Sequence, residues 1–336
     1  MDLCTLRTVL KLAETLEKDF PYLNTMICNA GIMGVEGLYW RKALWDVFTA
    51  PVQSVASPKF NKHSLGTLTK AQSSVEQGSS TTSEPSLGDI FTANIFGHYV
   101  LASRLVPLLS QVPTTAAPGR IIWTSSTEAH ASSFSLDDLQ CLDRREAYSS
   151  SKRLTDILVL TSNLTSTRPS VQSFYSTAHT GSSTRPEMYL AHPGTVGTDI
   201  VPLHPIIKPL KLLTFYLVRW LGNPWLTISP YKGAVSAVWL ALMPTSTLQG
   251  IEERDGKGKW GSAVDIFGNE RVMRSEVEGW GFGGVVGQES RLGKKGRNGN
   301  ALDLTDKGRE EFEELGQTAW DRMEKLRIQW EERLKQ

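Results

Sequence analysis

Residues 120–152 read RIIWTSSTEAHASSFSLDDLQCLDRREAYSSSK, and this stretch decides the fold. It begins with an apolar run, Ile121 to Trp123, which leads through a threonine to the serine pair Ser125-Ser126. A short apolar run between polar residues is typical of a fully buried strand rather than of a helix. Open α/β sheets bind ligands outside the carboxyl ends of their strands. The stretch therefore predicts that the serine pair lies at a ligand site.

The second half of the stretch carries a tyrosine and a lysine at helical spacing. Tyr148 and Lys152 are four residues apart and lead into apolar positions of helical period, so we expect them on one face of a helix. A cation near a phenol favours the phenolate and lowers the phenol pKa, as acid–base catalysis by tyrosine near neutral pH requires. Such a pair is by itself common on protein surfaces. The order of strand, serine pair, loop and helix favours the catalytic interpretation.

Composition narrows the class of protein. The chain has 336 residues, a formal net charge of +1, 40% hydrophobic residues and 21% charged residues. This balance predicts a globular protein with a substantial core, and the charge gives no electrostatic reason to expect nucleic-acid binding. The three cysteines lack CxxC spacing and the six histidines are scattered, so we expect neither a disulfide framework nor a metal site. The opening residues follow an amphipathic helical pattern and do not read as a secretory leader.

The rest of the chain alternates predicted strands and helices with polar segments. Apolar runs at 23–28 and 188–192 predict strands, and 87–109 predicts a helix. The pattern of the tail, 304–334, predicts a charged helix, and we expect its charges to form a solvated face. We expect a disordered polar insert at 67–87 and a second polar insert at 163–186. A Gly-rich segment, 283–300, is expected to be loose. We expect one main domain, 1–270, which contains both polar inserts, followed by a C-terminal loop and charged helix, 271–336.

Several of these segments together resemble the short-chain dehydrogenase/reductase family, and within it the sterol 3-ketoreductase branch. The similar segments are CNAGI (28–32), NIFGHYVLA (94–102), GRIIWTSS (119–126), FSLDDLQ (134–140), YSSSKRLTDILVLTS (148–162), PGTVGT (193–198) and RWLGNPW (219–225). The resemblance implies an α/β fold with a Rossmann-like, doubly wound parallel sheet. It also implies NADPH-dependent reduction of a 3-keto sterol to the 3-hydroxy sterol, during removal of the C-4 methyl groups in ergosterol synthesis.

The resemblance also implies roles for individual residues. Tyr148 would protonate the carbonyl oxygen, and Lys152 would lower the tyrosine pKa and hold the nicotinamide ribose. Ser126 would bind the substrate oxygen, with Ser125 as the alternative within the pair, and Asn94 would complete a proton relay. The cofactor-binding residues implied, besides Tyr148 and Lys152, are Asp2, Asn29, Ala30, Gly31, Pro193, Gly194, Thr195 and Thr198.

One departure from the family is large. The family opens on a strand and a Gly-rich turn, TGxxxGxG, that cradle the cofactor pyrophosphate, and this sequence contains no such motif. We interpret Met1 to Cys4 as the end of the family's third strand, and the fold as truncated at its N-terminal nucleotide-binding end. Weak NADPH binding by the chain as written is the expectation. Two alternatives stay open: a non-catalytic homologue that binds a sterol or a partner, and a reductase of another bulky apolar ketone.

Residues 203–226 are strongly apolar with basic residues between them. Their uninterrupted apolar run is too short to cross a bilayer. A basic-edged amphipathic segment suits a peripheral membrane contact, and a lid over an apolar substrate is equally compatible. We expect the protein on the cytosolic face of the endoplasmic reticulum or on lipid droplets, where other enzymes of sterol C-4 demethylation would be possible partners.

Overall fold

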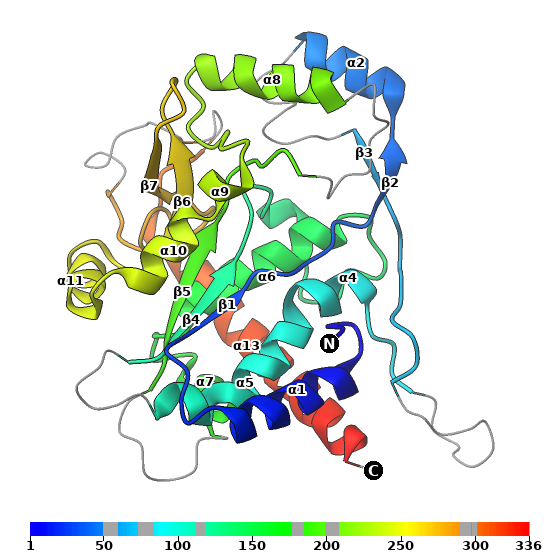
Figure 1. The fold of residues 1–336 in the computed structure, drawn as a ribbon, viewed down its shortest axis with the longest axis vertical. Coiled ribbons are helices and arrows are strands. Elements are labelled where there is room, and N and C mark those ends of the chain that lie inside the picture. The colour runs from blue at the N-terminus through cyan, green and yellow to red at the C-terminus, as the bar shows by residue number, and fades with distance from the viewer. Residues whose placement is uncertain are drawn as a thin grey trace.

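The computed structural model describes residues 1–49, 60–72, 84–111, 118–176, 185–198, 208–288, 297 and 301–335. Their centre is a five-stranded sheet of order β1-β4-β5-β6-β7 (Figure 1). The first four pair in parallel and β7 runs antiparallel to β6. The strands are Thr25–Cys28, Arg120–Thr124, Glu187–His192, Lys259–Val264 and Glu270–Ser275. The predicted α/β class and the three predicted strands are confirmed.

Alternate residues of the central strands enter different cores, as the two-residue period of a strand requires. Ile121 and Trp123 of β4 pack into one hydrophobic cluster and Ile122 into another. In β5, Met188 and Tyr189 divide in the same way. A strand that is buried on both faces reads as a continuous apolar run, which explains the opening of the diagnostic stretch.

Helices cover both faces of the sheet. The larger cluster is completed by α1 (Leu6–Asp19), α5 (Gly97–Ser110), α6 (Ala147–Thr161), α7 (Arg168–Tyr175) and α13 (Asp306–Leu334). The smaller cluster is covered by α10 (Val235–Leu242) and α11 (Thr245–Asp255), and the short α9 (Pro230–Gly233) precedes them. This two-sided packing is the doubly wound arrangement.

The predicted helix 87–109 is present, with a local irregularity. It consists of α4 (Asp89–Phe91), a π-helical turn η1 (Thr92–Phe96) and α5. The π-turn includes Asn94. Single π-turns inside helices are frequent at functional sites because the extra residue redirects side chains.

β1 lies at one edge of the described sheet (Figure 1). The interpretation of Met1 to Cys4 as a strand end is wrong, because these residues form a turn into α1. The Asp2 carboxylate accepts the Cys4 N–H at 3.0 Å and the Thr5 hydroxyl at 3.1 Å. These contacts organise the start of α1 locally, and no strand of the described residues pairs with β1 on that side.

The structure corrects two predicted polar segments where it describes them. The segment 163–186 contains α7, whose Val171 and Phe174 are fully buried in the core. At 67–72, the side chain of Gln72 is buried and accepts the Leu6 N–H at 2.8 Å. The polar composition of these segments did not indicate the few groups that face inward. Residues 73–83 and 177–184 lie outside the described residues.

The segment predicted to be loose, 283–300, is also held where it is described. Gln288 is buried and donates to the Asp255 carbonyl at 2.8 Å. Arg297 forms ion pairs with Glu276 at 2.9 Å and with Asp303 at 2.7 Å. Long-range partners therefore fix positions that local composition marks as flexible, and 289–296 and 298–300 lie outside the described residues.

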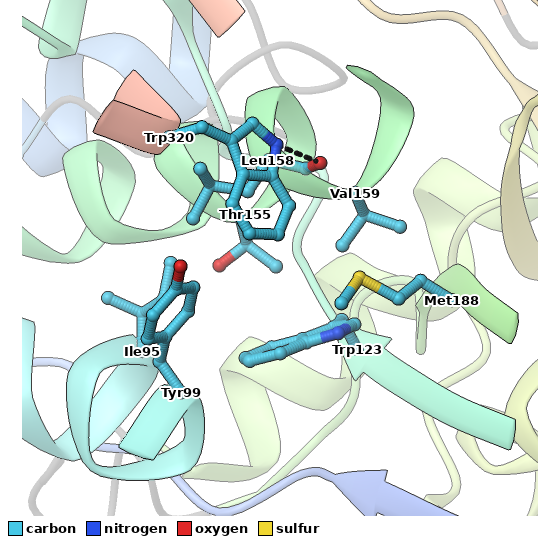
Figure 2. A pocket seen from close by; sticks show the side chains of 8 residues that line it. All are labelled: Ile95, Tyr99, Trp123, Thr155, Leu158, Val159, Met188 and Trp320. Carbon is cyan, nitrogen blue, oxygen red and sulfur yellow. Dashed lines mark hydrogen bonds between the residues drawn. The ribbon is translucent and has the colours of Figure 1, made fainter. Parts of the chain in front are cut away.

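A small apolar cavity of about 10 Å³ lies in the larger core (Figure 2). Its wall combines the sheet, through Trp123, with α5, α6 and α13, through Tyr99, Leu158 and Trp320. Ligand pockets are typically about 300–1,000 Å³, so this space is a packing defect and not a substrate site.

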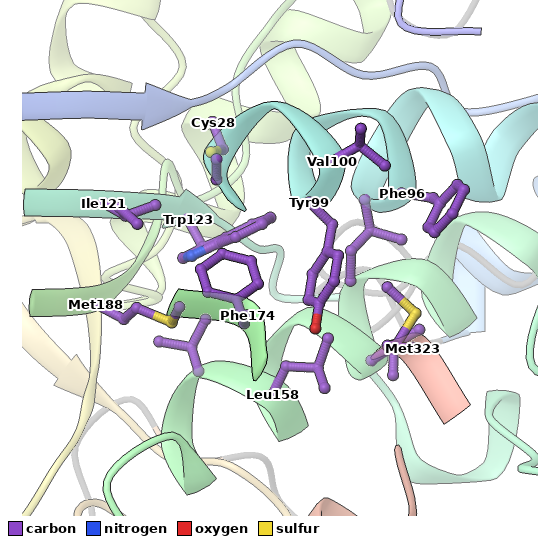
Figure 3. Close-up of a cluster of buried hydrophobic side chains, with 14 of the residues drawn as sticks. Cys28, Phe96, Tyr99, Val100, Ile121, Trp123, Leu158, Phe174, Met188 and Met323 are labelled. Atoms are coloured by element: carbon purple, nitrogen blue, oxygen red, sulfur yellow. The ribbon is translucent and has the colours of Figure 1, made fainter. Parts of the chain in front are cut away.

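The tail forms α13, as predicted, but its charges are not all solvated. Figure 3 shows Tyr99, Leu158 and Met323 meeting in the core that α13 covers. Tyr99 donates to Glu324 at 2.7 Å, and Arg327 donates to Glu324 at 2.8 Å. Arg327 and Glu324 are 4% exposed. The expectation of a solvated face is wrong for this stripe, because α5 supplies complementary polar groups.

Two peripheral helices lie at the top of Figure 1. They are α2 (Trp40–Thr49), which follows β2 (Val35–Leu38), and α8 (Lys208–Trp220). β2 pairs antiparallel with β3 (Asn61–His63) in a separate two-stranded sheet. Within the predicted apolar segment 203–226, Lys208–Trp220 is a helix and 221–226 are turns and irregular chain, and 199–207 lies outside the described residues.

Candidate active site

The serine pair lies at the carboxyl end of β4, and its two side chains have different surroundings. Ser125 is buried, its N–H donates to Ala191 O at 2.7 Å, and its hydroxyl donates to the Asp156 carboxylate. The Ser126 hydroxyl accepts the Glu128 N–H at 3.1 Å and lies close enough to Tyr148 to lower its pKa. The geometry therefore brings Ser126 to Tyr148 and turns Ser125 inward.

Tyr148 and Lys152 lie one turn apart near the start of α6, as their spacing predicts. The Lys152 ammonium lies 5.8 Å from the centre of the Tyr148 ring. It donates to the Thr124 carbonyl at 2.7 Å, so α6 is tied to the end of β4. Ser126, Tyr148 and Lys152 are thereby gathered at one end of the sheet.

The pKa values of Tyr148 and Lys152 are both shifted. Burial raises the pKa of Tyr148, the Glu128 carboxylate raises it further, and the bond with Ser126 acts in the opposite sense. Burial lowers the pKa of Lys152 to about 8, while Asp156 opposes the change. Burial is the largest of these causes and disfavours the phenolate, and the predicted effect of Lys152 on the tyrosine pKa stays a prediction. Near neutral pH, Tyr148 is a neutral phenol that can donate a proton.

Asn94 joins the loop after β1 to the catalytic helix. Its side chain accepts the Ile32 N–H at 2.7 Å and donates to the Ile32 carbonyl at 2.9 Å. It also donates to the Ser151 hydroxyl on α6 at 3.1 Å. A Cβ at Gly31 would lie 2.7 Å from the Asn94 amide oxygen and 3.9 Å from the Lys152 nitrogen. The loop therefore requires glycine at position 31, and Asn94 and Lys152 lie close to that glycine.

The predicted cofactor-side residues occupy loops that flank the serine pair. Asn29, Ala30 and Gly31 follow β1, and Pro193, Gly194 and Thr195 follow β5. Because β1 and β5 are the two neighbours of β4, both loops emerge at the same sheet edge as Ser126.

Each of the two loops is fixed by local contacts. The Ala30 carbonyl lies 2.9 Å from a ring nitrogen of His98. The Thr124 hydroxyl donates to the Asn29 side chain at 3.4 Å. Gly194 has a φ of +69°, and a Cβ there would lie 2.4 Å from the Trp225 carbonyl. The small residues let the backbone approach a flat ligand, so these loops fit a nicotinamide cofactor.

Comparison with known proteins identifies the family. The 3-keto-steroid reductase erg27 of Aspergillus fumigatus is 43% identical over 349 residues, covering 99% of this chain and 77% of that protein. The 3-keto-steroid reductase ERG27 of Gibberella zeae is 36% identical over 363 residues, covering 98% of this chain and 75% of that protein. The chain belongs to the 3-keto-steroid reductase family. It is accordingly an oxidoreductase.

No protein-family profile matches the chain. Among solved structures, a putative uncharacterized protein from Mycobacterium paratuberculosis covers 97% of this chain and 74% of its own, with a TM-score of 0.42 and 16% identity.

Two of the predicted cofactor-binding residues have contacts other than those around Ser126, Tyr148 and Lys152. Asp2 is exposed and serves the start of α1, as described above. Thr198 is exposed, and its carbonyl accepts a bond from the Lys211 ammonium at 3.3 Å. Their predicted part in cofactor binding stays a prediction.

The sequence analysis missed three charged residues that surround Ser125, Tyr148 and Lys152. Burial raises the pKa of Glu128 to about 7, and this carboxyl group acts electrostatically on Tyr148. Asp156 and Lys259 form an ion pair of 2.7 Å behind Ser125. The position of Asp156, one turn after Lys152, was a usable signal. Nothing local marks Lys259, which is 107 residues away from Lys152 in the chain.

No metal-binding group of three or more His, Cys, Asp or Glu residues occurs among the described residues. The three cysteines are free. In the part of the chain that the structure covers, no helix is both long and apolar enough to span a bilayer.

Proposed function

We propose that this chain reduces the 3-keto group of a sterol with NADPH, as the names of its relatives suggest for the substrate. The observation that carries the proposal is the contact of Ser126 with a neutral Tyr148 phenol beside Lys152. A proton donor and a second hydroxyl group at one point are what a carbonyl oxygen needs as it gains negative charge.

Each residue then has a defined task. Tyr148 donates its proton to the carbonyl oxygen, while Ser126 donates a hydrogen bond to the same oxygen. Lys152 is charged below its pKa of about 8 and stabilises the phenolate that Tyr148 becomes. Asn94 holds the loop after β1 against α6 through Ile32 and Ser151.

The nicotinamide cofactor supplies the hydride. The loops after β1 and β5, together with Lys152, would hold its nicotinamide half. This assignment is supported by Gly31 and Gly194 in these loops, because a side chain at either position would collide with the surrounding structure. The choice of NADPH over NADH rests on the resemblance alone.

Tyr148→Phe tests the reaction because it removes the proton donor and keeps the ring. General acid catalysis contributes typically about 10²–10⁴-fold, so turnover of a 3-keto sterol should fall by at least about 100-fold. NADPH oxidation is the assay, and sterol affinity should change little. Ser125→Ala is the matched control for Ser126→Ala and should lower turnover less. Equal turnover of the Tyr148→Phe variant and the parent would contradict the proposed role.

The apolar outer face of α8 supports peripheral binding to a membrane of the endoplasmic reticulum or a lipid droplet. Leu213, Leu217 and Trp220 are 53%, 47% and 61% exposed, whereas Phe215 and Val218 pack inward. Exposed apolar residues on one helical face suit the interfacial region of a bilayer.

Leu213→Asp together with Leu217→Asp tests this contact. The change should lower co-sedimentation with phosphatidylcholine/phosphatidylserine vesicles several-fold without altering thermal unfolding, because both side chains are exposed. Ile328→Asp, on the exposed side of α13, is the control. Undiminished vesicle binding by the α8 variant would exclude this face as the membrane contact.

A further inference from the structure

Three charged side chains hold the last residues of β4 and the serine pair. The Thr124 carbonyl accepts the Lys152 ammonium at 2.7 Å, and the Ser125 hydroxyl donates to Asp156. The Ser126 carbonyl accepts the Lys259 ammonium at 2.7 Å. Each of three successive residues is therefore fixed by a different charged group.

These charged groups form one buried cluster. The Lys259 ammonium donates to the Asp156 carboxylate at 2.7 Å. The exposed fractions are 4% for Lys152, 1% for the Asp156 side chain and 4% for the Lys259 side chain. Asp156 comes from α6 and Lys259 from the first position of β6, whose partner in β5 is Leu190. Removing one member of a buried ion pair leaves an uncompensated charge, so each member has a strong effect on the others.

Asp156 and Lys259 act on Lys152 in opposite directions. Burial is the main cause that lowers the pKa of Lys152, Asp156 raises that pKa, and Lys259 lowers it further. The cluster holds two ammonium groups and one carboxylate. Its charge balance, rather than burial alone, decides how easily Lys152 gains or loses its proton.

The other groups that face this cluster leave that balance in place near neutral pH. Burial raises the pKa of the Cys28 thiol on β1, so the thiol is uncharged. Burial lowers the pKa of His98 on α5 to about 4 and that of His192 on β5, which faces Lys259, well below its usual value, so both imidazoles are uncharged. The Tyr148 ring is neutral, and Arg153 is a permanent cation that acts on Asp156 and Lys259. Asp156 and Lys259 are thus the charges whose removal reaches Lys152 directly.

We propose that Asp156 and Lys259 are positioning residues: Asp156 holds the Ser125 side chain, Lys259 holds the Ser126 carbonyl, and their opposite charges together set the charge state of Lys152. The relevance to catalysis rests on the proposed function of Ser126 and Lys152. The charge coupling itself does not, and it can be measured in a protein without activity.

The test measures the titration of Lys152 in the full 336-residue chain. Trace acetylation with acetic anhydride across a pH series labels only neutral amines, and peptide mass spectrometry quantifies the label on Lys152. Asp156→Asn should move the labelling midpoint to lower pH, and Lys259→Met should move it to higher pH. For a shift of about one pH unit, labelling at the parent midpoint changes by about two-fold upward and about five-fold downward, respectively.

Matched controls remove the same charges from exposed sites. Asp137→Asn and Lys325→Met change side chains that are 97% and 75% exposed, and neither should move the Lys152 midpoint. If Asp156→Asn does not fold, the double variant Asp156→Asn/Lys259→Met removes both charges of the pair and avoids a lone buried ion. Its midpoint should lie below that of Lys259→Met.

The outcomes separate cleanly. Opposite shifts in the two single variants, or the expected order of Lys259→Met and the double variant, support the proposal. Shifts in the same direction, or no shift in Lys259→Met, overturn it. A failure of Tyr148→Phe to lower turnover would contradict the proposed function and leave this titration result untouched.

Discussion

Truncating Trp320 tests whether α13 is part of the core that carries the catalytic helix. Trp320 is 1% exposed, and its indole N–H donates to the Leu158 carbonyl of α6 at 3.0 Å. It also lines the cavity beside Tyr99 and Trp123, so truncation enlarges an existing void. The neighbouring side chains already fail to fill this space, and we expect little relaxation to offset the loss.

The magnitude follows from these contacts. Replacing a buried Trp by Ala typically costs about 3–5 kcal/mol, and loss of one neutral hydrogen bond about 0.5–1.5 kcal/mol. We therefore expect Trp320→Ala to lower the free energy of unfolding by about 4 kcal/mol. Trp320→Phe keeps a ring and loses the N–H, so its cost should be about 1–2 kcal/mol.

Urea unfolding followed by far-UV circular dichroism measures both variants, with the slope m as a check on two-state behaviour. Ile328→Ala, at a 41% exposed position of the same helix, is the control and should change stability by less than about 0.5 kcal/mol. A loss below about 1 kcal/mol for Trp320→Ala, or separate melting of α13 before the rest, would refute the reasoning that α13 and α6 unfold together.

Two further changes probe the site. Gly31→Ala places a Cβ 2.7 Å from the Asn94 amide oxygen, so it should cost about 1–3 kcal/mol of stability in urea unfolding; a neutral effect would mean that this loop is loose. Glu128→Gln should remove a pH dependence: the raised pKa of Glu128 means that the folded state binds more protons than the unfolded state between pH 4.5 and about 7, so the stability of the parent relative to the variant should fall as pH rises through this window. Parallel stability curves for the parent and the Gln variant over that range would show that Glu128 titrates normally.

The sequence alone determined the local elements of the site. Apolar continuity predicted β4, and a four-residue spacing placed Tyr148 and Lys152 on one face of α6. These inferences succeeded because burial on both faces of a strand and the period of a helix leave their pattern in neighbouring residues. The loops after β1 and β5 were also predictable, since small residues follow each apolar run.

The choice of the serine that meets Tyr148, and the direction in which the tyrosine pKa moves, depend on how the chain packs in three dimensions. The two serines are adjacent, and their roles separate because Asp156 takes the hydroxyl of Ser125 while Ser126 turns to Tyr148. The pKa depends on how deeply the fold buries the phenol, and composition and spacing do not carry that information. Lys259 reaches Ser126 from β6, 133 residues further along the chain, so no local pattern predicts the contact. Periodicity reports on neighbours in sequence, whereas charge pairing and burial depend on neighbours in space.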